Sequence, residues 1–225
     1  MKSIQFNKHL FYLEESGALI WPKKSVGIVS DLHLEKSSYF AKDGIFLPPY
    51  DSYETLLNLK KMIKTNGVKK LILLGDIFHD NYGFERLETN SKKIFKSILD
   101  SNEIVFVHGN HDENINIPDV KFFYNFTENN INFSHEPKEN NNHQVCGHLH
   151  PKITLKVNNK KISKKCFVLT KKIIFLPAYG KFTGGLDIKD KVFNKYIDKN
   201  SIFFPIHNNK IYEVNDFLTI KNKKL

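Results

Sequence analysis

The chain has 225 residues, and its 34 Lys and Arg against 24 Asp and Glu give a formal net charge of +10. A hydrophobic content of 40% excludes a wholly disordered chain, and no apolar run approaches the roughly 18 residues of a membrane span. Charged residues interrupt the N-terminal segment where a signal peptide is apolar. Two cysteines are too few for a disulfide framework. We therefore expect a soluble, cytoplasmic protein with no membrane partner.

The basic excess has two explanations. Lys and Arg neutralise phosphates, which points to nucleic acid. However, only Arg86 is arginine, and alanine occurs only at residues 18, 41 and 178, the pattern expected when an AT-rich genome replaces GC-rich codons. We favour compositional drift and treat charge as a weak indication of function. Because arginine is scarce, the chain has few guanidinium groups that could form bidentate hydrogen bonds with guanine. Sequence-specific recognition of bases is therefore not expected.

Alternating elements are predicted in the first half of the chain. In order they are a strand at 25–30, a helix at 51–66, a strand at 70–74, a helix at 85–102 and a strand at 103–107. The first helix begins with Asp51 and Glu54 at capping-box spacing and ends at Gly67. This alternation predicts an α/β fold with parallel strand pairing.

The second half is predicted to be rich in strands, at residues 130–133, 143–146, 153–157, 166–169 and 173–176. Two Asn/Lys tracts, 138–142 and 158–161, predict surface turns rather than linkers. No internal repeat and no Gly/Ser/Pro-rich boundary divides the chain. We expect a single domain over residues 1–225.

Five polar motifs follow predicted strands: Asp31-Leu32-His33, Gly75-Asp76, Gly109-Asn110-His111-Asp112, Ser134-His135 and Gly147-His148-Leu149-His150. Strand ends in an open α/β sheet share one edge, where ligands bind. Residues two apart at a strand end project to the same side. Apart from His111 and Asp112, the motifs together offer two carboxylates, one amide and four imidazoles. This mixed N/O donor set is typical of Mn, Fe or Zn rather than Ca or Mg.

Each motif alone also has a structural explanation. An isolated Asp-x-His or Gly-Asp after a strand is more often structural than catalytic. The GNHD run alone is compatible with a turn in left-handed conformations, and GHLH with a surface hairpin. Five such motifs, each after a predicted strand, favour a functional site over coincidence.

The order DLH, GD, GNHD, H and GHLH resembles the calcineurin-like metallophosphoesterase superfamily. More narrowly, GALIWP before SDLHLEK, then GDIFH, GNHD, GHLHP, CFVL and LPAYGKFTGGLDI resemble the bacterial DNA-ligase-associated phosphoesterases. These blocks cover about Gly17 to Ile188. One departure is Glu35, where that subfamily usually has Gly, and its carboxylate can alter the approach to the site.

The resemblance implies a four-layer α/β/β/α sandwich with a dinuclear metal site between the sheet edges. The implied ligands form three groups: Asp31, His33 and His150 for one metal ion, Asn110, His135 and His148 for the other, and Asp76 as the bridge. Two divalent ions, with Mn favoured and Fe or Zn as alternatives, bring a charge of +4. The two aspartates and a bridging hydroxide bring −3, so the residual +1 attracts a phosphate. Coordination lowers the pKa of water from roughly 15.7 to about 7, which makes a hydroxide nucleophile available.

Three further residues are expected to serve catalysis. The resemblance makes His111 the general acid that protonates the leaving oxygen, the alternative being a hydrogen bond to a ligand. Asp112 is included as a carboxylate that organises the loop or orients a histidine. His79 lies in the GDIFH block, which resembles double-strand-break repair nucleases, and is expected either to contact substrate or to close the loop. The remaining histidines have no motif partners and are interpreted as structural: His9, His108, His143 and His207.

Three functions are weighed. The favoured one is a metal-dependent phosphodiesterase acting on nucleic acid or a nucleotide-like diester, with DNA-repair proteins as partners suggested by the resemblance. The second is a phosphomonoesterase acting on nucleotides or phosphoproteins, since the same motifs serve both kinds of ester. The third is a non-catalytic scaffold, which the complete ligand set disfavours.

Overall fold

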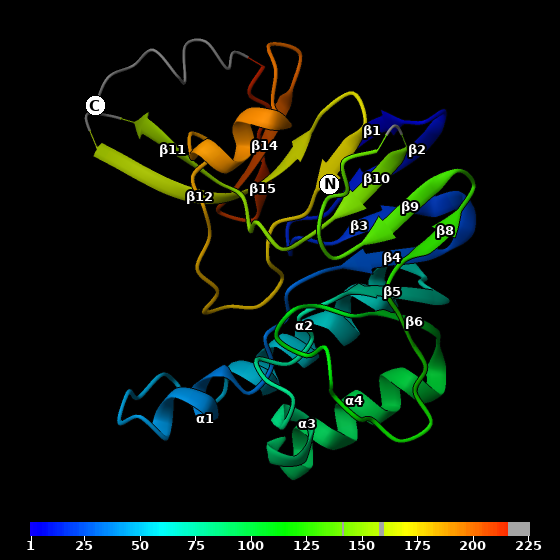
Figure 1. Cartoon of the computed structure of the whole chain (residues 1–225), viewed down its shortest axis with the longest axis vertical. Helices are drawn as coiled ribbons and strands as arrows, with labels where there is room; N and C mark the ends of the chain where they lie inside the picture. The colour runs from blue at the N-terminus through cyan, green and yellow to red at the C-terminus, as the bar shows by residue number, and fades with distance from the viewer. Residues whose placement is uncertain (141, 158–159, 216–225) are drawn as a thin grey trace.

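Two β-sheets packed face to face form the centre of the protein in the computed structural model, which describes residues 1–140, 142–157 and 160–215 (Figure 1). Strands β4 to β7 of the first sheet run parallel, and β1 to β4 pair antiparallel. From edge to edge this sheet contains β1 (Lys2–Phe6), β2 (His9–Leu13), β3 (Leu19–Trp21), β4 (Val26–Val29), β5 (Lys70–Leu74), β6 (Glu103–Val107) and β7 (Phe122–Phe123).

The second sheet is mixed. From edge to edge it contains β15 (Lys210–Ile211), β14 (Ile202–His207), β12 (Lys160–Leu169), β13 (Ile173–Phe175), β10 (His143–Cys146), β9 (Ile131–Ser134) and β8 (Phe126–Glu128). Strands β9, β10 and β13 are parallel, and the others pair antiparallel. Strand β11 (Lys152–Val157) forms a hairpin with β12 that extends away from the sheet (Figure 1).

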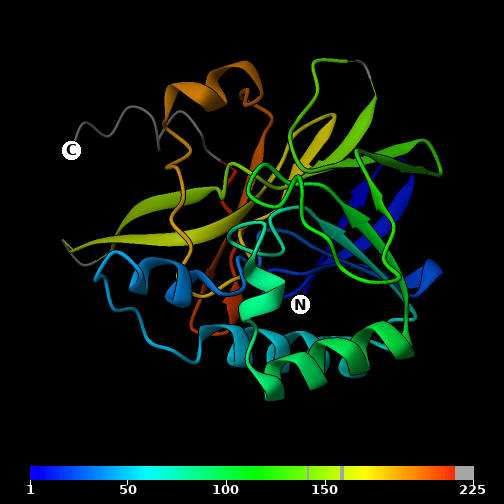
Figure 2. The same cartoon turned by 60° about the horizontal axis from the view of Figure 1, so that its bottom comes forward.

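Helices cover the outer face of the first sheet. Helices α2 (Asp51–Asn66) and α4 (Thr89–Ser101) lie side by side along that face (Figure 2). The shorter α1 (Lys36–Ala41) and α3 (Gly83–Arg86) lie near the site edge, and the 3₁₀ turn η1 (Pro22–Lys24) precedes β4. On the outer face of the second sheet, the covering helix is the short 3₁₀ helix η2 (Lys191–Lys195). None of the helices in the described part of the chain is long and apolar enough to span a membrane.

Three apolar clusters hold these layers together. The cluster between the sheets contains fully buried aromatic side chains from both of them, including Phe11, Phe133 and Phe167. A second cluster joins the first sheet to α2 and α4, and a third lies under η2 around Phe193. The α/β fold with two packed sheets is therefore confirmed.

Most of the helices and strands predicted from the sequence are confirmed. The predicted elements at 51–66, 70–74, 103–107 and 143–146 match α2, β5, β6 and β10 residue for residue. The strands predicted at 153–157 and 173–176 differ from β11 and β13 by one residue at one end, and those predicted at 25–30 and 130–133 differ from β4 and β9 by one residue at each end. The N-terminal strands β1 to β3 were not predicted, although buried and exposed side chains alternate along β1.

Two predictions about helices are wrong. The helix predicted at 85–102 is broken, because Glu88 is extended (φ −62°, ψ 150°) and its side chain accepts from the Asn90 backbone N–H at 3.2 Å, which starts α4 anew. The capping box predicted at Asp51 is absent, because Tyr50 precedes the first turn and the Asp51 carboxylate accepts from the Ser37 hydroxyl at 2.9 Å.

The turn predicted at 158–161 is also partly wrong. Residues 158 and 159 lie outside the described residues, but Lys160 and Lys161 belong to β12, where they pair with β11. Strand β12 is thus longer than the predicted 166–169 because its first half pairs only within the hairpin. In the other predicted turn, 138–142, residue 141 lies outside the described residues.

We expect Phe133→Ala to destabilise the protein by about 3–5 kcal/mol, because it removes a fully buried ring between the sheets and leaves a cavity. Urea unfolding followed by circular dichroism measures this change. The control is Phe46→Ala, since Phe46 is 84% exposed and its loss should change stability by only about 0.5 kcal/mol or less. Equal effects of the two substitutions would contradict this account of the core.

Candidate metal centre

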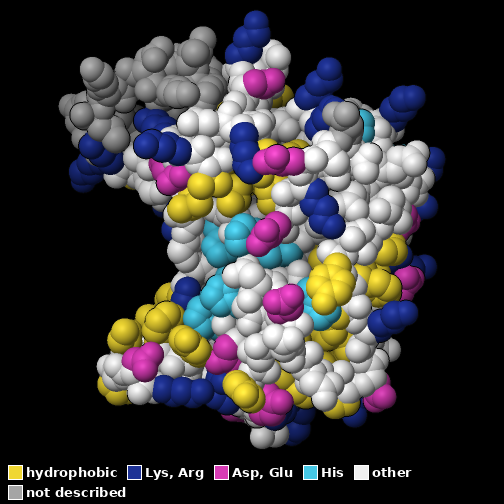
Figure 3. Space-filling model, viewed as in Figure 1, with side chains coloured by type: hydrophobic (Ala, Val, Ile, Leu, Met, Phe, Trp, Pro, Cys, Tyr) yellow, Lys and Arg dark blue, Asp and Glu magenta, His cyan; other side chains and the backbone are white. Residues whose placement is uncertain are grey.

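Five loops meet at one edge of the two sheets, and each follows a parallel strand. The loops after β4, β5 and β6 come from the first sheet, and those after β9 and β10 from the second. Carboxyl ends of parallel strands share one edge, which explains why motifs far apart in sequence converge. Figure 3 shows histidine side chains gathered on this face, at the inner end of a notch above the α1 segment.

Backbone hydrogen bonds lock the loops together. The Asp31 and His33 amides donate to the carbonyl oxygens of Gly75 (3.1 Å) and Asp76 (2.9 Å), which joins the first two loops. The His148 amide donates to Asp31 Oδ2 at 3.1 Å and so ties the second sheet to the first. Five of the predicted ligands have positive φ in the left-handed region, a conformation that persists only where the surroundings enforce it: Asp31, His33, Asp76, His148 and His150.

Four predicted ligands form the first donor cluster: Asp31, His33, Asp76 and His150. One ligand atom from each lies within 4.8 Å of the others. His150 Nε2 is 2.9 Å from Asp31 Oδ1 and 3.4 Å from His33 Nε2. Asp31 Oδ1 is buried but has no partner of acceptable hydrogen-bond geometry in the described part of the chain. Ligands of one cation face each other in this way.

The second donor cluster contains Asn110, His135 and His148. Asn110 Oδ1 lies 3.1 Å from both His135 Nε2 and His148 Nδ1, and these two nitrogens are 3.2 Å apart. Asp76 Oδ2 lies 3.4 Å from His135 Nε2 and 3.7 Å from His33 Nε2, between the two clusters. All seven predicted ligands therefore come together, with Asp76 in the central position.

The electrostatics of the site fit a cation. Burial opposes the ionisation of Asp31, but attraction to His150 and His135 holds the pKa of this carboxyl well below its usual range. Burial also lowers the pKa of His33 to about 3, which keeps this imidazole neutral, the form that binds metal. In His135 burial lowers the pKa, but the hydrogen bond to Asp76 and both carboxylates outweigh it and raise the pKa to about 9. The two buried carboxylates thus require positive charge beside them.

A backbone group orients one of the imidazoles. His135 Nδ1–H donates to the Leu74 carbonyl at 2.8 Å, which turns Nε2 toward Asn110 and Asp76. Such a hydrogen bond sets the tautomer of a metal-binding histidine. The sequence contains no signal for this contact, because Leu74 acts through its carbonyl group.

His111 and His79 lie together beside Asp76. The two rings stack with centroids 4.9 Å apart, and His111 Nδ1–H donates to the His79 carbonyl at 3.0 Å. His111 Nε2 therefore faces the site, 4.0 Å from Asp76 Oδ2. Sequence reasoning missed Tyr39 and Phe40, which flank the His79 ring at 4.8 and 5.3 Å.

Asp112 is fully buried beneath the loops. Its carboxylate accepts from four backbone amides, those of Asp76 (3.3 Å), Ile77 (2.6 Å), Phe78 (3.2 Å) and Gly109 (3.0 Å). This arrangement joins the loop after β5 to the loop after β6. Of the roles considered for Asp112, the geometry supports loop organisation.

Glu35 turns away from the donor clusters. Its carboxylate accepts from the Ser38 hydroxyl at 2.6 Å, and burial raises its pKa. Its φ of 65° lies in the left-handed region that favours glycine. This carboxylate therefore makes its hydrogen bond at the start of α1 rather than with the donor clusters.

The four histidines interpreted as structural do not join the clusters. His9 packs against Trp21, His108 stacks on Phe122, and His143 meets Phe6 edge-on. His207 is the last residue of β14. In the second sheet, β12 and β13 separate this strand from β10 and β9.

We expect Gly109→Ala to weaken metal binding by about 10- to 100-fold, the usual effect of disturbing a group that supports a ligand. An added methyl group at residue 109 would overlap the Asp76 carboxylate. Calorimetric titration with Mn²⁺ measures the affinity. Gly184→Ala is the matched control, because a methyl group there meets open space. Unchanged affinity in Gly109→Ala would argue against Asp76 as a ligand.

The fold resembles that of a solved nuclease structure. The Pseudomonas putida nuclease MPE has a TM-score of 0.74 and 22% identity, over 95% of this chain and 99% of that one. YfcE, a phosphoesterase from E. coli, has a TM-score of 0.41 and 14% identity, over 85% of this chain and 98% of that one. No curated protein sequence matches the chain with significance. The sequence model described as Calcineurin-like phosphoesterase matches residues 24–172, which include every residue of both donor clusters, and the chain belongs to this family of phosphate-ester hydrolases.

Proposed function

We propose that the protein hydrolyses phosphodiester bonds in nucleic acid or nucleotide-like substrates with the help of two divalent metal ions. The observation that carries this proposal is the central position of Asp76 between two donor clusters. The first ion would be held by Asp31, His33 and His150 and the second by Asn110, His135 and His148, with Asp76 shared. The donor chemistry favours Mn, with Fe or Zn as alternatives.

In the proposed reaction, His111 protonates the leaving group and His79 holds the His111 ring in place. Bound divalent ions in such a site act as Lewis acids that polarise phosphoryl oxygens and lower the pKa of water. His111 donates a proton from Nε2 to the leaving oxygen, because its Nδ1–H is already engaged by the His79 carbonyl. The His111 side chain is 39% exposed, so a substrate can reach it. His79 stacks on His111 and holds its ring plane.

The biological setting follows from the resemblance and is part of the proposal. The sequence blocks shared with DNA-ligase-associated phosphoesterases suggest a cytoplasmic enzyme that works beside DNA-repair proteins. The name of the similar P. putida structure, a nuclease, agrees with a nucleic-acid substrate. The basic composition agrees as well.

The test is a screen of the metal-reconstituted protein with Mn²⁺, Zn²⁺, Mg²⁺ and Fe²⁺. We expect faster hydrolysis of bis(p-nitrophenyl) phosphate than of the p-nitrophenyl monoester, and cleavage of single-stranded DNA, duplex DNA or RNA. Asp76→Asn should abolish both activities with the fold retained, as circular dichroism would show, because it removes charge between the clusters rather than packing. Turnover of the monoester alone would show instead that the protein is a phosphomonoesterase. The absence of turnover with every metal would favour a non-catalytic scaffold.

His111→Ala should keep its metal content and lose about 10²- to 10⁴-fold in rate on a poor leaving group, the usual contribution of a positioned acid. The loss should be much smaller for p-nitrophenol, which leaves without needing a proton. Steady-state rates on esters of graded leaving-group pKa, together with metal analysis, measure this difference. Equal losses across the series would show that His111 acts on the phosphate by charge instead.

A further inference from the structure

A basic pocket lies near the candidate metal centre. Its volume is about 280 Å³, and four lysines line it: Lys152, Lys164, Lys165 and Lys181. Hydroxyl groups complete much of the wall, namely those of Ser16, Ser163 and Thr183. Glu15 also lines the pocket, but its carboxylate pairs with the amino terminus of Met1 at 3.5 Å.

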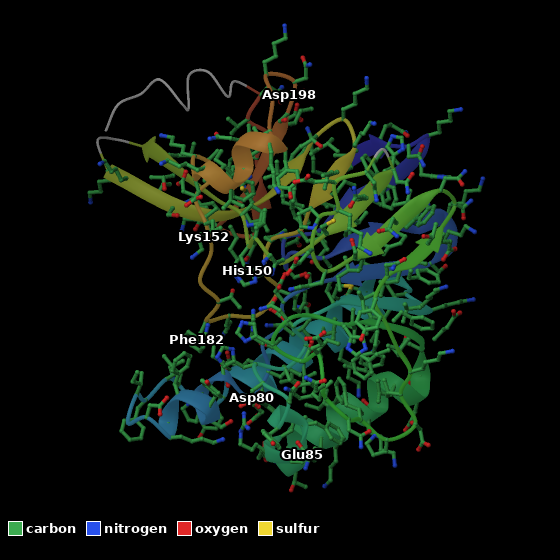
Figure 4. The ribbon with its side chains drawn as sticks, in the orientation of Figure 1. Asp80, Glu85, His150, Lys152, Phe182 and Asp198 are labelled. Carbon is green, nitrogen blue, oxygen red and sulfur yellow. The ribbon has the colours of Figure 1, made fainter. Side chains whose placement is uncertain are left out.

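The pocket lies near two of the predicted ligands, His150 and His33. Lys152 follows His150 by two residues, and both contact Gly185, where an added methyl group would overlap the His150 carbonyl and approach the Lys152 side chain. Lys181 and Thr183 line this pocket and also a narrow crevice that His33 lines. Figure 4 shows Lys152, His150 and Phe182 along the same side of the molecule.

Positive charge in this pocket is incompletely neutralised. Lys165 Nζ donates to the carbonyl groups of Ala178 (2.8 Å) and Gly180, which leaves one N–H free. Burial, with repulsion from Lys152, lowers the pKa of Lys165 to about 8. Lys181 pairs with Glu54, whereas Lys152 and Lys164 have no acidic partner among the described residues.

Building on the proposed phosphodiesterase activity, we propose that Lys152 and Lys165 form a subsite for an internucleotide phosphate that neighbours the scissile one. A phosphate between the two ammonium groups relieves their repulsion and accepts hydrogen bonds from lysine and hydroxyl donors. Lysine serves here as a point charge, which binds backbone phosphates without reading bases. A second phosphate subsite would make a nucleic-acid strand a better substrate than a small diester.

The test measures binding of a fluorescent oligothymidylate without a terminal phosphate to the full chain in EDTA, by anisotropy over a range of salt. Lys152→Gln should raise Kd about 3- to 10-fold at low salt, as expected for one partly exposed ion pair. It should also reduce the slope of log Kd against log salt by about 0.7, the value for one contact to a single strand. Lys152→Arg should retain the slope.

Lys23→Gln is the matched control. Lys23 is exposed in η1, at the amino end of β4, whereas the metal centre lies beyond the carboxyl end of that strand. It should change neither Kd nor slope. Lys165 is a poorer target because its side chain also holds the 178–180 backbone. Melting temperatures of all variants check the fold.

An unchanged slope in Lys152→Gln would overturn the subsite, and so would an effect seen only with a 5′-phosphorylated oligonucleotide. The KM of Mn²⁺-loaded protein for the oligonucleotide gives a second readout, which should rise in Lys152→Gln. Hydrolysis of bis(p-nitrophenyl) phosphate by the unaltered protein tests the proposed function separately. If that diester is cleaved and the slope is unchanged, the subsite fails and the function stands. If no ester is cleaved but the slope falls, the function fails and the anion site stands.

Discussion

The structure depends on two buried carboxylates, Asp31 and Asp76, placed where the edges of two sheets meet. A buried carboxylate is costly unless hydrogen bonds and positive charge compensate it. Asp31 accepts from the His148 amide and Asp76 from the His111 amide, so each carboxylate draws in a different loop. The imidazoles around them supply the remaining compensation and at the same time form two donor clusters. The need to satisfy these charges therefore both assembles the loops and creates the site.

The packing beneath the site holds the loops that carry the donor residues in place. Asp112 ties the loops after β5 and β6 through four backbone amides. Gly109 lies so close to the Asp76 carboxylate that only glycine fits. Below the loops, the aromatic cluster between the sheets fills the space densely, which limits relative movement of the two halves. The donors from the first sheet are thereby held beside those from the second.

Charge beyond the donor clusters is unevenly arranged. On the side of β11 and β12, lysines gather in a pocket next to His150, and most of their charge has no acidic partner within the described residues. On the side of α1, aromatic rings surround His79. A nucleic-acid strand likewise combines charged phosphates with apolar base faces, which agrees with the proposed substrate. Compositional drift explains the number of lysines, but not the burial of Lys165 beside Lys152.

Local patterns in the sequence were sufficient to predict strands β5, β6 and β10 and helix α2, because apolar periodicity and Gly67 act over a few residues. They also predicted that the five motifs meet at one edge, since each follows a strand. The choice of the seven donors came from the family resemblance and stays a prediction. Other features depend on contacts between distant residues. The break at Glu88, the Ser37 contact of Asp51 and the amides that surround Asp112 arise only when helices and loops pack. The pocket around Lys152 and Lys165 exists only because β11 and β12 pair so that these two lysines lie opposite each other, and no short-range pattern encodes that pairing.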